Sequence, residues 1–145
     1  MKIGIIISSL TKNIPYLTYL VSMGYDIYPI LLDKTINTDY NDCTKGVIEA
    51  IANRNIIYSD DLNKEYKFDS LVILVNHDEL QFLNKVIFDN VSQDNIPIII
   101  SCGKDLENDN LSIFTYPNLH IITKTSFNVV ENCDEIQKQL EKRKK

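Results

Sequence analysis

Short runs of mostly apolar residues recur along the chain, separated by segments in which apolar residues return every three or four positions. Aliphatic, β-branched runs of this length are typical of strands buried on both faces of a parallel sheet. The predicted strands cover Ile3–Ile7, Asp26–Leu32, Asn55–Ser59, Ser70–Val75, Ile96–Ile100 and Leu119–Thr123.

The segments after the first two strands predict amphipathic helices. The first helix is expected to start with Asn13 as its cap and Pro15 in an early position, and to end at Gly24. Its buried face is predicted to contain Leu17, Leu20 and Val21. The second helix is expected to open at Thr38 or Asp39, with an apolar face of Tyr40, Cys43, Val47, Ile48 and Ile51.

Two more helices are predicted by capping signatures in the second half of the chain. Asp78 with Gln81 three residues later forms a capping box, and Asn128 with Glu131 caps the last helix in the same way. The inner face of that last helix is predicted to be Val130, Cys133, Ile136 and Leu140.

Buried strands that alternate with amphipathic helices predict a single α/β domain over residues 1–145. We expect a three-layer sandwich with a doubly wound, mostly parallel sheet of about five to six strands, Rossmann-like or flavodoxin-like. Crossovers should be right-handed, but the pattern does not give the strand order. Residues 139–145 are predicted to form a basic helix end or tail.

Composition agrees with a globular chain and limits its partners. Of 145 residues, 44% are hydrophobic and 24% are charged, which are ordinary globular values. The net charge of −5, with basic residues clustered only at the C-terminal end, makes a nucleic-acid partner an unfavourable interpretation. The chain contains no apolar run of the roughly 18 residues that a membrane span needs and no signal-peptide pattern, so we expect no membrane contact and a cytoplasmic location.

Polar residues follow the predicted strands, where open parallel sheets bind ligands. In the first turn, Ser8, Ser9, Thr11 and Asn13 place hydroxyls and an amide between a strand and a helix N-terminus, which favours a phosphate. The alternative is that Asn13 only caps the helix and the serines satisfy the turn backbone. Asp33 is either a ribose-binding carboxylate or a turn residue. The remaining candidate ligand-binding residues are Asn76, Ser101, Cys102 and Gly103.

The spacing Ser9-x-Thr11-x-Asn13 resembles the phosphate loop of flavodoxins, which wraps the phosphate of flavin mononucleotide (FMN). Lys12 stands where that loop has glycine, and Ile14 where it has a hydroxyl. This resemblance implies a flavodoxin-like fold and FMN as a cofactor.

The order of elements also looks like that of the flavoproteins that include phosphopantothenoylcysteine decarboxylase and the flavoprotein component of dipicolinate synthase. The resemblance rests on the first strand and its serine turn, the strand Asp26–Leu32, and the run Asp69–Val75. It implies that Ser9 meets the flavin phosphate and Asn76 faces the ring. The decarboxylase's catalytic His and Pro-x-Met-Asn segment are absent, and Ser101-Cys102-Gly103 stands in place of the latter, so the resemblance implies the fold rather than the reaction.

Several other site classes lack their residues. The chain has no G-x-G-x-x-G and no P-loop motif, and Ser8-Ser9 stands where a receiver domain needs an acidic pair. Cys43, Cys102 and Cys133 have no C-x-x-C spacing, and the two histidines are far apart, so neither a disulfide framework nor a metal site is predicted. His77 can be interpreted as a general base or as a loop residue, and no catalytic constellation is recognised.

Two functions therefore remain open. The first is a domain that binds a phosphate-bearing small molecule, FMN or a nucleotide, at the carboxyl ends of the strands. The alternative is a non-catalytic interaction or regulatory protein on the same scaffold, with a protein partner or a homo-oligomer. The missing catalytic set, the eight tyrosines (among them Tyr16, Tyr19 and Tyr28) and the charged tail motivate this alternative.

Overall fold

Six strands form one sheet in the order β3-β2-β1-β4-β5-β6. The computed structural model describes residues 1–8, 10–32, 42–62, 65–75, 97–101, 119–122 and 128–143. Every strand pairing in this sheet is parallel, which confirms the predicted α/β class. The strands are β1 (Lys2–Ile7), β2 (Asp26–Leu31), β3 (Ile57–Tyr58), β4 (Ser70–Leu74), β5 (Ile98–Ser101) and β6 (Leu119–Ile122).

The strand order is that of doubly wound sheets in the dinucleotide-binding class. The chain moves outward from β1 through β2 to β3, and then returns to place β4 on the other side of β1. Without the two-residue strand β3, the remaining five strands follow the flavodoxin-type order. Both descriptions put the switch point of the sheet between β1 and β4.

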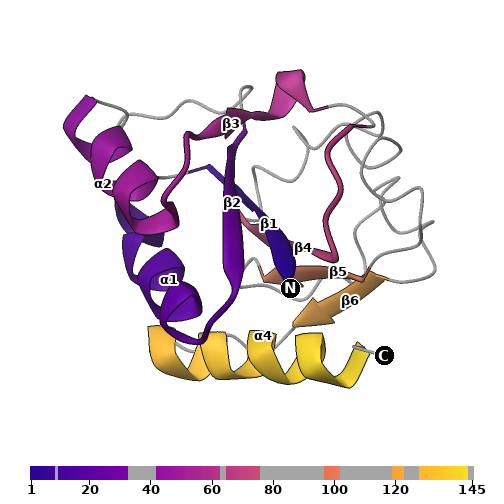
Figure 1. Ribbon diagram of the computed structural model, residues 1–145. Coiled ribbons are helices and arrows are strands. Elements are labelled where there is room, and N and C mark those ends of the chain that lie inside the picture. The colour runs from indigo at the N-terminus through magenta and orange to yellow at the C-terminus, as the bar shows by residue number, and fades with distance from the viewer. Residues whose placement is uncertain are drawn as a thin grey trace.

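Three helices pack side by side on one face of this sheet (Figure 1). They are α1 (Leu10–Ser22), α2 (Asp42–Ala52) and α4 (Val129–Arg143), and α1 lies between the other two. A short 3-10 turn, η1 (Ser59–Asp61), follows β3. The helix predicted from Asp78 lies outside the described residues.

Alternation along the strands divides the core between the two faces of the sheet. Ile5 and Ile7 of β1 join the buried cluster with Leu17 of α1 and Ile136 of α4. Side chains of the opposite register are equally buried, since Ile6, Ile73 and Ile98 have no exposed surface. Both faces of the sheet are therefore covered, as expected for a sandwich.

The starts of α1 and α4 differ in how well they were predicted. Asn128 caps α4 as expected, because its Oδ1 accepts hydrogen bonds from the Val130 N–H at 2.9 Å and the Glu131 N–H at 3.4 Å. The predicted cap of α1 is wrong, because α1 begins at Leu10 and Asn13 lies within its first turns. Pro15 is likewise inside the helix, at an exposed position, and it lacks the N–H that an α-helix uses at such a position.

The predicted inner faces of α2 and α4 were too wide. Ile48 and Cys133 are fully buried, as predicted. Cys43 and Val47 on α2 are exposed instead, Val47 by 42%, and Val130 on α4 is 44% exposed. The helical rotation places these side chains outside the core although their spacing matches it.

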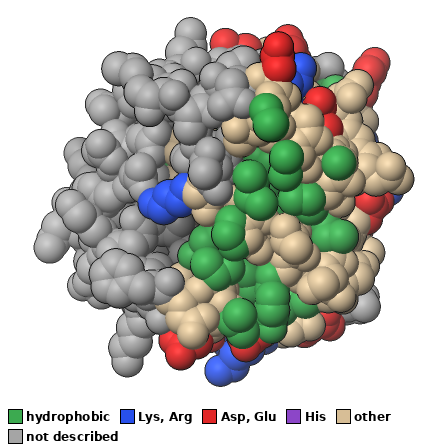
Figure 2. Space-filling model, turned by 90° about the vertical axis from the view of Figure 1, so that its left-hand side faces the viewer, with side chains coloured by type: hydrophobic (Ala, Val, Ile, Leu, Met, Phe, Trp, Pro, Cys, Tyr) green, Lys and Arg blue, Asp and Glu red, His purple; other side chains and the backbone are tan. Residues whose placement is uncertain are grey.

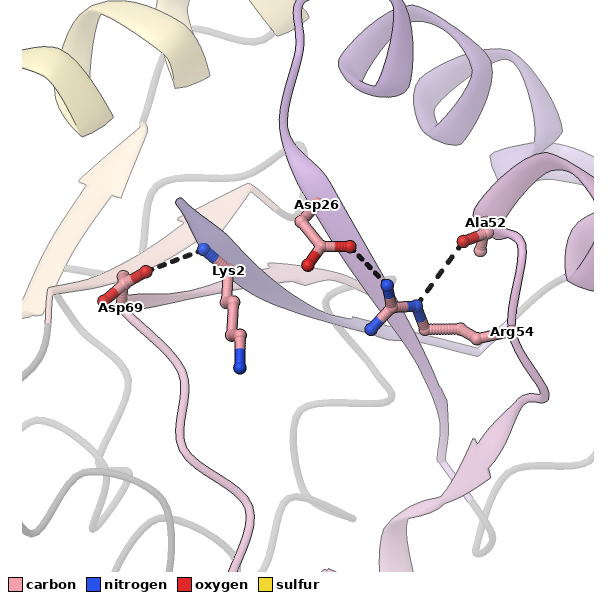
Figure 3. A network of polar contacts seen from close by, with 5 residues as sticks. All are labelled: Lys2, Asp26, Ala52, Arg54 and Asp69. Atoms are coloured by element: carbon pink, nitrogen blue, oxygen red, sulfur yellow. Dashed lines mark hydrogen bonds and ion pairs between the residues drawn. The ribbon is translucent and has the colours of Figure 1, made fainter.

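Charged side chains at the amino ends of the strands are used for structural contacts (Figure 3). The Lys2 N–H donates to Asp69 Oδ2 at 2.7 Å, which joins the start of β1 to the residue before β4. Arg54, just after α2, donates to the Asp26 carboxylate and to the Ala52 carbonyl. These contacts lie at the end of the sheet opposite to the predicted ligand site.

Arg54 also protects the open edge of β2. Its guanidinium carbon lies 3.6 Å from the centroid of the Tyr28 ring. β3 pairs with β2 only at Ile30 and Leu31, so the earlier part of β2 has no outer partner among the described strands. Pro29 suits that position because it has no N–H that would need a partner on the β3 side.

Candidate functional site

The carboxyl end of β1 lies at the switch point of the sheet. Ile7 is level with Leu31 of β2 and Leu74 of β4, and the Leu32 N–H donates to the Ile7 carbonyl at 2.9 Å. Ser8, the next residue, is therefore flanked by the ends of both neighbouring strands. Ligands of doubly wound sheets bind at this location.

The first turn of α1 begins two residues after Ser8. This turn contains no acidic residue, and its charged side chain is the exposed Lys12. The first backbone N–H groups of a helix have no partner within it, and the helix dipole places a partial positive charge there. The N-terminus of α1 together with Lys12 therefore has the electrostatic character that an anion requires.

Two buried polar side chains lie where β1 passes into α1. Ser8 and Asn13 are each only 4% exposed, and each has an interaction partner in the structure. Asn13 precedes Leu17 by four residues and Leu20 by seven, so it belongs to the inner face of α1. The spacing of Asn13 to Leu17 and Leu20 is visible in the sequence, but the interpretation of Asn13 as a helix cap did not use it. Asn13 therefore brings an amide to the edge of the core below the first turn.

The other candidate residues are placed only in part. Thr11 is the second residue of α1, next to Lys12. Ser101 is the last residue of β5, two strands from β1, which corresponds to about 10 Å across the sheet. The structure thus places Ser8 at the carboxyl end of β1, the backbone of Thr11 in the first turn of α1, and Asn13 on the inner face of that helix. Ser101 ends β5 on the same edge of the sheet. Outside the described residues lie Ser9, Asp33, Asn76, His77, Cys102 and Gly103.

The residues with perturbed pKa values lie elsewhere, around α4. Burial, and then the Glu141 carboxylate that accepts the Tyr25 hydroxyl hydrogen bond at 3.0 Å, raises the pKa of Tyr25 to about 12. Burial, and then Asp134, raises the pKa of the Cys133 thiol to about 12. These groups hold α4 against the core, and their protonated forms are the stable ones.

The described part of the chain shows neither a metal cluster nor a membrane-spanning helix. No group of three or more His, Cys, Asp or Glu residues within it is arranged to hold a metal ion. None of its helices combines the length and the apolar character needed to cross a membrane.

No protein-family model matches the chain, and no curated protein matches its sequence.

Proposed function

We propose that this chain binds a phosphate-bearing small molecule, a nucleotide or FMN, at the carboxyl ends of β1 and β4. The observation that carries the proposal is the strand order, because it places Ser8 and the first turn of α1 at the switch point of the sheet. The absence of acidic side chains in that turn supports an anionic ligand group.

In this proposal the phosphate lies at the N-terminus of α1. Ser8, Ser9 and Thr11 supply hydroxyls, and the backbone N–H groups of the first turn donate to the phosphate oxygens. Asn13 contributes from the inner face of α1 rather than as a helix cap. Asp33, Asn76 and residues 101–103 surround the rest of the molecule. The proposal is one of binding and assigns no catalytic step.

The interaction or regulatory function remains the second candidate. It is favoured by the apolar outer surface of α1 and α2, where Val47 is 42% exposed.

Thermal unfolding with added ligands, preceded by an absorption spectrum of the freshly purified protein, tests the binding proposal. A ligand at 100 times its dissociation constant stabilises the folded chain by about 2.7 kcal/mol. We expect FMN, a nucleotide or inorganic phosphate at millimolar concentration to raise the melting temperature. A colourless protein whose melting temperature is unchanged by all three would refute the proposal.

A charge reversal at Lys12 locates the site. In Lys12→Glu, the attraction between the lysine and a doubly charged phosphate about 6 Å away becomes a repulsion. After screening at physiological salt, this change weakens ligand binding about tenfold. Lys138→Glu is the matched control, because Lys138 lies in the middle of α4 and undergoes the same charge change. Equal ligand affinities in the two variants would exclude the first turn of α1 as the phosphate site.

A further inference from the structure

Pro15 weakens the hydrogen bonding of α1 just after its first turn. Proline has no backbone N–H, so the Thr11 carbonyl cannot accept the hydrogen bond that an α-helix forms between positions 15 and 11. In the next turn, Thr18 Oγ1 donates to the Ile14 carbonyl at 2.8 Å, a contact that often bends a helix. The position of the first turn of α1 therefore depends on contacts with the rest of the molecule.

The apolar contacts of α1 define this position less precisely than hydrogen bonds do. Figure 2 shows hydrophobic side chains gathered in a band on the side of the molecule that carries α1 and α2. On the inner side of α1, Leu17 and Leu20 join the core cluster. Hydrophobic attraction has no preferred direction, whereas a hydrogen bond requires its two atoms at a defined distance and angle. Hydrogen bonds from α1 to a neighbouring element are therefore the contacts that fix its height and rotation.

Tyrosine hydroxyls join α4 to α1 and to the residues that follow α1. The three hydrogen-bonded pairs are Asn132–Tyr16 at 2.7 Å, Tyr19–Asp134 at 3.4 Å and Tyr25–Glu141 at 3.0 Å. The pairs occur in the same order along both segments, so α1 and α4 run in the same direction. Of the three tyrosines, Tyr16 lies nearest the first turn of α1, and it is therefore the contact through which α4 can hold that turn.

The Tyr16 contact is also better shielded from water than the Tyr19 contact. Asn132 is only 5% exposed, and its Nδ2 donates to the Tyr16 hydroxyl oxygen. Asp134 is exposed, so water can replace the Tyr19 hydroxyl as its partner. Removing an acceptor from a buried amide costs more than removing a bond that water replaces. Of these two contacts between α1 and α4, the one at Tyr16 should therefore hold α1 more strongly.

Asn13 connects the Tyr16 contact to the junction of β1 with α1. Asn13 and Tyr16 are three residues apart in the helix, so they lie on one side of it, one turn apart. Asn13 and Ser8 are each only 4% exposed, where β1 passes into α1. A displacement of α1 at Tyr16 therefore moves Asn13 and the N–H groups of the first turn relative to the carboxyl end of β1.

We propose that Tyr16 and Asn132 are positioning residues for the proposed phosphate site, because their hydrogen bond lets α4 hold the first turn of α1 beside the carboxyl end of β1. Neither side chain touches the phosphate in this proposal. The inference rests on the proposed function, but the position of the turn is also measurable without a ligand. It makes α4, from the other end of the sequence, part of the support of the site.

NMR of the ligand-free chain tests whether Tyr16 positions the turn. Tyr16→Phe removes the hydroxyl and keeps the ring, so the direct effect of the ring on neighbouring resonances changes little. We expect the backbone N–H resonances of residues 10–13 to shift in Tyr16→Phe. They should stay in place in Tyr19→Phe, the matched control, which removes the exposed bond to Asp134. The other resonances of each spectrum confirm that both variants fold, and equal shifts at residues 10–13 in the two variants would contradict the positioning.

Titration with inorganic phosphate measures the consequence for the site. The net contribution of one hydrogen bond corresponds to about a fivefold change in an equilibrium constant, so Tyr16→Phe should raise the phosphate dissociation constant by up to about fivefold. Tyr19→Phe should bind phosphate like the unmodified chain. Equal dissociation constants in the two variants would overturn the inference and leave the proposed function standing. An unmodified chain that binds neither phosphate nor FMN nor a nucleotide refutes the proposed function, and the inference with it.

Pro15→Ala supplies a readout that a purely structural contact would not change. Alanine restores the helical donor for the Thr11 carbonyl, so the helix then supports its own first turn. Tyr16→Phe should therefore weaken phosphate binding less in the Pro15→Ala chain than in the unmodified chain. A double-mutant cycle compares the four dissociation constants, and strictly additive effects would contradict the dependence of the first turn on Tyr16.

Discussion

Gly4 in the middle of β1 is the position where an added methyl group should have the clearest effect on the core. A Cβ at this position would lie 2.9 Å from Leu71 Cδ2 and 3.2 Å from both Ile30 Cδ1 and Phe68 Cδ2. Leu71 and Ile30 have no exposed surface, and the Phe68 ring is held by edge contact with Tyr28 at 5.4 Å between centroids. All three atoms are side-chain atoms in a buried part of the core, so the added methyl group requires them to shift within close packing.

The magnitude follows from two opposing terms. Overpacking a well-filled core costs about 1–3 kcal/mol, whereas replacing glycine with alanine gains about 0.4–1 kcal/mol by restricting the unfolded chain. We therefore expect Gly4→Ala to lower the free energy of unfolding by about 1–2 kcal/mol. For a domain of this size, that change lowers the melting temperature by about 3–6 °C.

Gly46→Ala is the matched control, with the same added methyl group in open space. Gly46 lies inside α2, and no atom comes within 4 Å of its added Cβ. Because alanine is a better helix former, the variant should gain up to about 1 kcal/mol. Thermal and urea unfolding of both variants and of the unmodified chain measures the two changes in the free energy of unfolding. A Gly4→Ala variant as stable as Gly46→Ala would refute the close packing around Gly4.

Two further predictions concern the edge of β2 and the core below α4. Arg54→Ala should lower the free energy of unfolding by about 1–2 kcal/mol in urea, because it removes the stacking on Tyr28 and the partly exposed pair with Asp26. Arg54→Lys should recover only part of this loss, and full recovery would show that charge rather than stacking matters. The pKa of Cys133 rises from an ordinary 9.0 to about 12 in the folded chain, so the unfolded chain loses its thiol proton first and stability should fall as the pH rises from 9 to 12. The urea midpoint of Cys133→Ala should fall less steeply over that pH range than the midpoint of the unmodified chain. Identical slopes for the two proteins would contradict the raised pKa of Cys133.

The strands were predictable from sequence because their burial leaves a strong local signal. The runs around Ile5 and Val72 are aliphatic and continuous, which a strand covered on both faces requires, and both were found in place as β1 and β4. The strand order was not predictable, because parallel strands carry the same pattern wherever they lie in the sheet. That order depends on how the crossovers pack, a property of the whole chain.

The errors in the helices also have physical causes. Asn13 carries the local signal of a cap, but tertiary burial uses it on the inner face of α1 instead. Val47 and Val130 match the spacing of the core residues, yet the core needs only the narrower stripes that contain Ile48 and Cys133. An apolar stripe wider than the core it serves cannot be recognised before the rotation of the helix is known. The candidate site was located by the predicted strand ends, while its position at the switch point required the sheet order.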